Sequence, residues 1–112
     1  KEKKRMQKVS KEIKKQMERE LRQYWTNKSK LDRLIKQSSC STRTLLYCQE
    51  RINYVENVIN RLNSFEKEVF ELIFKENCDF TYCEQMKHIN KNTYYNIYNK
   101  SIYYLAQEFG II

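Results

Sequence analysis

The scarcity of helix-breaking residues constrains this chain more than any other feature. Among its 112 residues Pro is absent and Gly occurs once, at Gly110. Because Pro and Gly interrupt helices most strongly, their scarcity favours long helices joined by polar turns. Hydrophobic residues make up 40% of the chain, which supplies a modest core for one small domain with or without an extension. We therefore predict an all-α fold.

Two helices are predicted in the N-terminal half. Apolar residues recur at three- and four-residue steps over residues 5–37, which predicts one long basic helix. A polar stretch at 37–42 separates it from a second helix at 43–62, whose apolar residues form a heptad seam. This seam fits either an intramolecular helical hairpin or a homodimer formed through residues 44–62. The seam consists of Leu45, Cys48, Ile52, Val55, Ile59 and Leu62.

Three shorter helices are predicted over residues 63–112. The first two, at about 64–76 and 82–88, each follow a capping box, in which two side chains satisfy the free backbone N–H groups of a helix start. The two boxes pair Asn63 with Glu66 and Thr81 with Glu84.

The last helix is predicted to begin after Asn90 or Asn92 and to continue to about Phe109, with Gly110 as its C-cap. A short helix, a tight turn and a longer helix follow each other in the order of a helix-turn-helix. Four residues are expected to form the inward stripe of the last helix: Tyr94, Ile97, Ser101 and Leu105.

The net charge of +8 is unevenly distributed. Residues 1–37 hold 14 Lys or Arg against 5 acids, whereas residues 63–112 hold 5 against 7. Within the second segment, residues 85–107 contain three lysines and no acid, so one face of this domain should attract a polyanion. The basic N-terminal arm fits a solvated helix face, a phosphate-binding strap or an assembly helix. A solvated face with a weak attraction for DNA is the default interpretation.

Catalysis and metal binding are not predicted. The chain has a single His, no Gly-rich phosphate loop and no paired acids in an apolar context. Its four cysteines, at spacings C-x7-C and C-x4-C, lack the close pairing of zinc ligands, so we expect free thiols in a reducing cytoplasm and no cofactor. No apolar run is long enough to cross a bilayer, and no membrane partner is expected.

Nucleic-acid recognition has a concrete mechanism in this sequence. In a helix-turn-helix the first side chains of the last helix reach base edges, where Asn can pair with adenine and Lys can donate to guanine. Thr and Tyr at the start of the preceding helix can contact phosphate. An alternative is that these residues form an ordinary solvated face supplied by an AT-biased genome. The candidate DNA-binding residues are Lys91, Asn92, Thr93, Tyr95, Asn96, Asn99, Lys100, Thr81 and Tyr82.

From Leu62 onward the sequence resembles the promoter-reading region of bacterial sigma factors. The resembling segments are 62–69, 73–74, 81–86, 89–93, 100–102 and 105–106. A closer resemblance is to phage and prophage transcriptional regulators of the RinA and ArpU type, which join a helical N-terminal half to a sigma-like helix-turn-helix. Their ending corresponds here to Thr93, Lys100, Leu105-Ala106 and Gly110.

This resemblance implies a regulator that activates late phage genes in the cytoplasm of a bacterial host, at the nucleoid. Asn96 and Asn99 depart from it, because Arg is frequent at such positions, and this departure lowers the expected phosphate affinity. We predict a helical region at 1–62, a DNA-binding domain at 63–112, and sequence-specific binding of double-stranded DNA. RNA polymerase is a possible partner, through the acidic helix at 64–76. Alternatives are a small terminase-like packaging subunit, a helical interaction adaptor and a sigma factor fragment.

Overall fold

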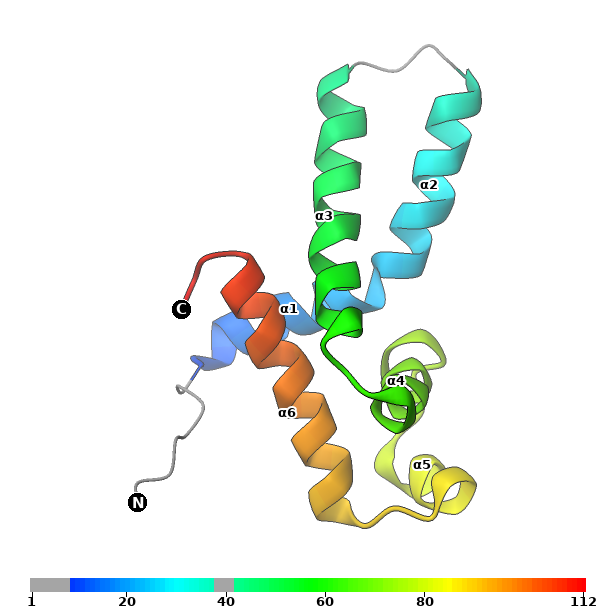
Figure 1. The fold of residues 1–112 in the computed structure, drawn as a ribbon, viewed down its shortest axis with the longest axis vertical. Coiled ribbons are helices and arrows are strands. Elements are labelled where there is room, and N and C mark those ends of the chain that lie inside the picture. Colours follow the sequence, from blue (N-terminus) through cyan, green and yellow to red (C-terminus); the bar gives the residue numbers. More distant parts are fainter. Residues whose placement is uncertain (1–8, 38–41) are drawn as a thin grey trace.

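The computed structural model describes residues 9–37 and 42–112. Helices are the only regular secondary structure over these residues, which confirms the predicted all-α fold. In chain order the elements are α1 (Lys11–Arg22), α2 (Tyr24–Gln37), α3 (Thr42–Asn60), α4 (Ser64–Phe70), the π-helix η1 (Glu71–Lys75), α5 (Phe80–Lys87) and α6 (Lys91–Glu108). The antiparallel pair α2 and α3 projects from a body that contains α1, α4, α5 and α6 (Figure 1).

The heptad seam of α3 lies against α2 within the chain. Cys48, Ile52 and Val55 are buried as the heptad pattern predicts, but lower down Val58 is buried while Ile59 is only half-buried. A straight helix drifts relative to a strict heptad, and the lower part of α3 passes from α2 to α6, so the buried stripe shifts by one residue. The seam therefore serves an intramolecular hairpin. A homodimer through residues 44–62 stays a prediction.

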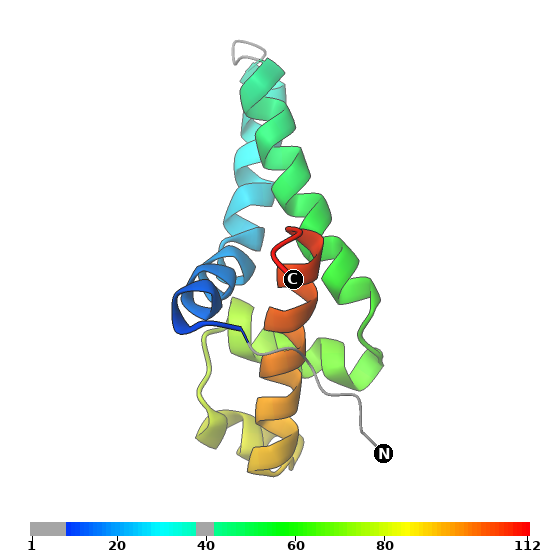
Figure 2. The same ribbon diagram turned by 90° about the vertical axis from the view of Figure 1, so that its left-hand side faces the viewer.

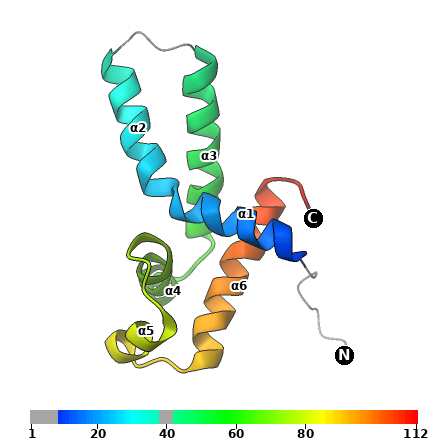
Figure 3. The same cartoon turned by 180° about the vertical axis from the view of Figure 1, so that it is seen from behind.

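The single long helix predicted at 5–37 is wrong in its start, over the described residues, and in its continuity. Residues 5–8 of that range lie outside the described part, and α1 begins after Ser10, whose side chain accepts a hydrogen bond from the N–H of Ile13 at 3.2 Å. The helix is then interrupted at Gln23, and α2 runs in a new direction (Figure 3). No Pro or Gly causes this bend. It lets Met17 and Leu21 of α1 enter the body of the molecule while α2 packs along α3.

The helix predicted at 64–76 is divided as well. Its predicted capping box is present, with Asn63 N–H donating to Glu66 Oε1 at 3.0 Å and Glu66 N–H donating to Asn63 Oδ1 at 2.8 Å. The α-helical pattern ends at Phe70, and five residues of π-helix follow. π-helical turns are widened relative to an α-helix, and this one turns Ile73 and Phe74 into the core.

The capping box predicted at Thr81 and Glu84 is wrong. Asp79 caps α5, since its carboxylate accepts a hydrogen bond from the N–H of Tyr82 at 3.0 Å, and Thr81 lies within the first turn. Asp is as good an N-cap as Thr. The earlier start also brings the ring of Phe80 against that of Tyr94, with centroids 5.5 Å apart.

One core joins the two halves of the chain. It includes residues on both sides of the predicted boundary at 62/63, and α6 packs on both α1 and α3. The largest fully buried side chains of this core are Met17, Leu21, Val58, Val69, Phe70, Ile73, Phe74, Ile102 and Leu105.

Candidate nucleic-acid interface

Helices α5 and α6 and the turn between them form a helix-turn-helix arrangement at one end of the molecule (Figure 1). The chain leaves α5 at His88, which adopts a left-handed conformation with φ of 55°. Ile89 is buried in the turn, and Asn90 then caps α6 by accepting a hydrogen bond from the N–H of Thr93 at 2.8 Å. The turn therefore fixes the start of α6 after Asn90, which is one of the two caps that the sequence predicts.

The rotation of α6 about its own axis is fixed by its buried side. The predicted inward stripe is correct, because Tyr94, Ile97, Ser101 and Leu105 are all buried. Ser101 satisfies its hydroxyl by donating to the carbonyl of Ile97 at 2.8 Å. Since this side faces the core, the opposite side of α6 must face solvent.

Three asparagines and a tyrosine line that opposite side. Asn92, Asn96, Asn99 and Tyr103 are separated by four, three and four residues, which places them in one stripe along the helix. Asn92 and Asn96 are exposed, and Asn99 and Tyr103 are half-exposed. Figure 2 looks onto α6 from the side on which no described helix covers it. The structure therefore brings the three predicted asparagines to one accessible face.

The remaining candidates at the start of α6 differ in accessibility. Lys91 is exposed at the first position of the helix. Tyr95 is 44% exposed, and its ring lies edge-on to Tyr94 with centroids 4.8 Å apart. Thr93 is half-buried, and its backbone N–H is already bonded to Asn90. Lys91 and Tyr95 are thus better placed to contact a ligand than Thr93.

Lys100 lies on a different side of α6 and has a partner inside the protein. Its Nζ lies 2.6 Å from Glu66 Oε2, which ties α6 to the start of α4. Burial alone would raise the pKa of Glu66, but hydrogen bonds from Lys100 and from the Asn63 backbone hold it below its ordinary value. Lys87 of α5 is held in the same way by Glu68, at 2.5 Å. Two of the few cations of this region are therefore neutralised within the chain.

Thr81 and Tyr82 are both exposed in the first turn of α5. The Asp79 carboxylate accepts the Tyr82 N–H, so a negative charge already occupies this helix start. A phosphate group would be repelled there, although a helix N-terminus commonly attracts one. The side-chain hydroxyls of Thr81 and Tyr82 remain candidates; the backbone site is occupied.

Sequence reasoning missed the contribution of α1 to this region. Tyr98 on α6 donates its hydroxyl to Glu18 Oε1 at 2.6 Å, and Arg22 holds the other carboxylate oxygen of Glu18 at 2.6 Å. Arg22 also donates to the carbonyl of Ile73 at 2.9 Å and to the side chain of Asn77. Burial and the bond to Glu18 raise the pKa of Tyr98, which keeps its phenol protonated as a donor. A Glu and an Arg four residues apart are common on helix surfaces. The spacing of Glu18 and Arg22 therefore does not predict that Glu18 contacts Tyr98 on α6.

Thiols and acidic side chains are the remaining groups of chemical interest among the described residues. Cys48, Cys78 and Cys83 are free thiols, and burial raises the pKa of Cys78 and Cys83, which disfavours the nucleophilic thiolate. Cys40 lies outside the described residues. Over residues 9–37 and 42–112, no group of three or more His, Cys, Asp or Glu is placed to hold a metal ion. None of the described helices is both long and apolar enough to cross a bilayer.

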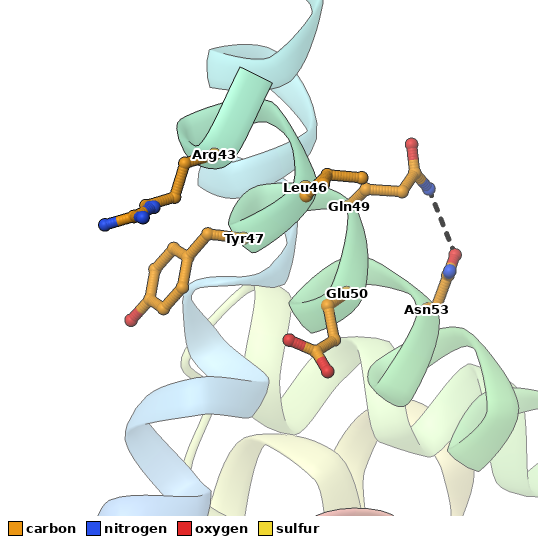
Figure 4. A pocket seen from close by; sticks show the side chains of 6 residues that line it. All are labelled: Arg43, Leu46, Tyr47, Gln49, Glu50 and Asn53. Carbon is orange, nitrogen blue, oxygen red and sulfur yellow. Dashed lines mark hydrogen bonds between the residues drawn. The ribbon is translucent and has the colours of Figure 1, made fainter. Parts of the chain in front are cut away.

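A shallow surface pocket of about 500 Å³ lies on the exposed face of α3 (Figure 4). Leu46 and Tyr47 are 64% and 55% exposed there, and Gln49 donates to Asn53 at 3.0 Å beside them. All of its lining residues belong to one helix, so the pocket has no opposing described wall to enclose a small molecule. It is lined by Arg43, Leu46, Tyr47, Gln49, Glu50 and Asn53.

Comparison of the chain with protein-family models, with curated proteins and with solved structures gives no match. Function is therefore inferred from the geometry and chemistry of α5 and α6 themselves.

Proposed function

We propose that this chain binds double-stranded DNA in a sequence-specific manner, with α6 in the major groove, and that it regulates transcription. The carrying observation is the outer stripe of α6, in which Asn92, Asn96 and Asn99 project side by side and no acid occurs on the helix before Glu108. An Asn side chain offers both a donor and an acceptor, which match the N7 and N6 positions of adenine. A helix without acids on this face avoids repulsion by phosphate.

A purely structural role accounts poorly for these asparagines. Asn is a weak helix former, less favourable than Ala by several tenths of a kcal/mol per residue. Asn57 and Asn53 on α3 have hydrogen-bonding partners, with Asn57 donating to Glu108 at 2.8 Å. No side-chain bond within the described chain engages Asn92, Asn96 or Asn99. Three consecutive outward positions thus retain free hydrogen-bonding groups, which supports an external partner.

Activation at phage-type promoters, with RNA polymerase as a partner, extends this proposal through the resemblance to sigma-like regulators. The exposed Glu71 of η1 lies on the acidic segment that would face polymerase. Glu68 contributes less to such a surface, since Lys87 holds its carboxylate.

The test is a selection from a random duplex pool, followed by fluorescence anisotropy on the selected and scrambled duplexes. Wild-type protein is expected to prefer one class of sequence. Asn92→Ala/Asn96→Ala should lose that preference by about 30-fold or more, because each bidentate base contact discriminates by about 1–3 kcal/mol. Asn60→Ala, which removes an exposed asparagine at the end of α3, is the matched control and should retain the preference.

Equal binding of the wild-type protein to all duplexes, unchanged in the double variant, would contradict the proposal. That result would direct attention to the α2–α3 hairpin and to an adaptor or assembly role. Light scattering on the same samples separates a regulator, expected as a monomer or dimer, from a ring-forming packaging subunit.

A further inference from the structure

We propose that α1 supplies the phosphate contacts that position α6 on DNA, through an exposed basic edge formed by Lys11, Lys15 and Arg19. This inference rests on the proposed function. It assigns DNA-backbone binding to a helix that lies outside the helix-turn-helix.

The helix-turn-helix region is short of free positive charge. Residues 63–112 hold 5 Lys or Arg against 7 acids. Of these cations, Lys87 and Lys100 are paired with glutamates and Lys91 is exposed at the start of α6. Lys67 and Lys75 are exposed on α4 and η1. Affinity for duplex DNA comes largely from neutralising phosphates, and proteins of this kind commonly make several such contacts. Lys91 alone on α6 provides few phosphate contacts, so an element packed against α6 is the natural source of further cations.

Helix α1 is in the right place to supply them. It packs on α6, where Glu18 accepts the Tyr98 hydroxyl at 2.6 Å, and Figure 3 shows α1 passing in front of the C-terminal part of α6. Asn92 precedes Tyr98 by six residues, which corresponds to about 9 Å along a helix rising 1.5 Å per residue. The major groove is about 12 Å wide. Tyr98, which Glu18 of α1 contacts, therefore lies within about one groove width of Asn92 along α6.

The cations of α1 face the required side. Lys15 precedes Glu18 by three residues and Lys11 precedes it by seven, so both share the side of the helix that meets α6, and Arg19 continues the edge one turn further on. All three are exposed, and no ion pair within the described chain neutralises them. Glu20, which is buried against Arg51 of α3, marks the opposite side.

Helix α2 offers a matched comparison. Lys30, Arg33 and Lys36 are exposed and carry the same total charge on a helix of similar length. They lie on the projecting hairpin, which extends away from α5 and α6 (Figure 1). The long-range attraction of DNA depends on the net charge of the protein, so the basic residues of α1 and those of α2 contribute equally to it. Direct contact with phosphate also requires a position beside α6.

The experiment measures binding of the selected duplex over a salt series for the full chain and two triple variants. Lys11→Gln/Lys15→Gln/Arg19→Gln should reduce the slope of log K against log salt by up to about 2.7, at about 0.9 per lost contact, and should retain the base preference. Lys30→Gln/Arg33→Gln/Lys36→Gln should leave the slope near that of the wild type. Lys15→Gln alone, which removes one exposed side chain, should reduce it by about 0.9.

Equal slopes for the two triple variants would overturn the inference while leaving the proposed function intact, provided that the wild type still selects a sequence. A wild-type protein that shows no salt-dependent affinity for duplex DNA would overturn both. Circular dichroism melting of each variant confirms folding, and exposed positions such as these are expected to change the melting temperature little.

Discussion

Glu18 shows how a single side chain can connect elements that are distant in the sequence. Its carboxylate accepts hydrogen bonds from Tyr98 on α6 and from Arg22 on its own helix. Burial opposes ionisation of Glu18, but these hydrogen bonds and the charge of Arg22 outweigh it and hold the pKa below its ordinary value of 4.5. A carboxyl group whose pKa is lower in the folded state stabilises that state only while it is ionised.

The stability of the protein should therefore fall as the pH drops below about 4.5. The contribution of Glu18 is fully present above its unfolded pKa and is lost as the pH passes downward through the folded pKa. Glu18→Gln should lower the melting temperature at pH 6 and should reduce its decline between pH 5 and about pH 3, measured by circular dichroism. Glu12→Gln, at an exposed position of the same helix, is the control. A decline for Glu18→Gln as steep as that of the wild type would refute this role.

Side-chain caps define where four of the described helices begin, α5 and α6 among them. Each of the four N-caps in the described chain that uses a side chain presents Ser, Asn or Asp to the third helical N–H, at Ser10, Asn63, Asp79 and Asn90. At the other end of α6, Gly110 adopts φ of +75°, and its N–H and that of Ile111 bond back to the last turn. These caps fix the length of α6 and the direction in which its asparagine stripe points.

The cap of α5 allows the two possible helix starts to be compared directly. Asp79→Ala should destabilise the protein by about 1 kcal/mol, because the N–H of Tyr82 loses its acceptor. Thr81→Ala should change stability by less than about 0.5 kcal/mol, since an exposed Thr within a helix contributes little. Urea denaturation of both variants gives the comparison. A larger loss of stability for Thr81→Ala than for Asp79→Ala would show instead that α5 begins after Thr81, as the sequence pattern predicted.

The molecule as a whole has one continuous core, from which the α2–α3 hairpin projects. The predicted division into 1–62 and 63–112 separates elements that pack together, since α6 contacts both α1 and α3. Ring contacts cross the same boundary, such as that between Tyr54 and Phe109 at 4.9 Å. Arg22 adds a polar link by donating to the carbonyl of Ile73.

A fragment of residues 63–112 is therefore expected to lose cooperative unfolding. Without α1 and α3, the buried Ile102 and Leu105 of α6 would be uncovered, and a domain of about 50 residues cannot readily compensate for lost core area. Thermal melting by circular dichroism and the dispersion of amide signals in NMR would measure this. The full chain is the reference. A fragment that melts sharply near the full-chain temperature would support two independent domains.

Much of the local structure was predictable from the sequence. The all-helical class, the capping box at Asn63, the inward stripe of α6 and the left-handed Gly110 follow from side-chain spacing and from the preferences of a few residue types. The outward stripe of asparagines follows for the same reason, because helical periodicity fixes both faces at once. These features depend on interactions between residues at most a few positions apart.

Contacts between distant segments decided the rest. No Pro or Gly marks the bend at Gln23, which arises because α1 packs mainly on α6 and η1 whereas α2 packs on α3. Lys100 looked available for DNA, but Glu66, 34 residues earlier, holds it, and the placement of α1 across α6 depends on Tyr98 and Glu18, 80 residues apart. Periodicity reports which face of a helix is buried. Which partner buries it is set by the summed packing and charge of the folded chain.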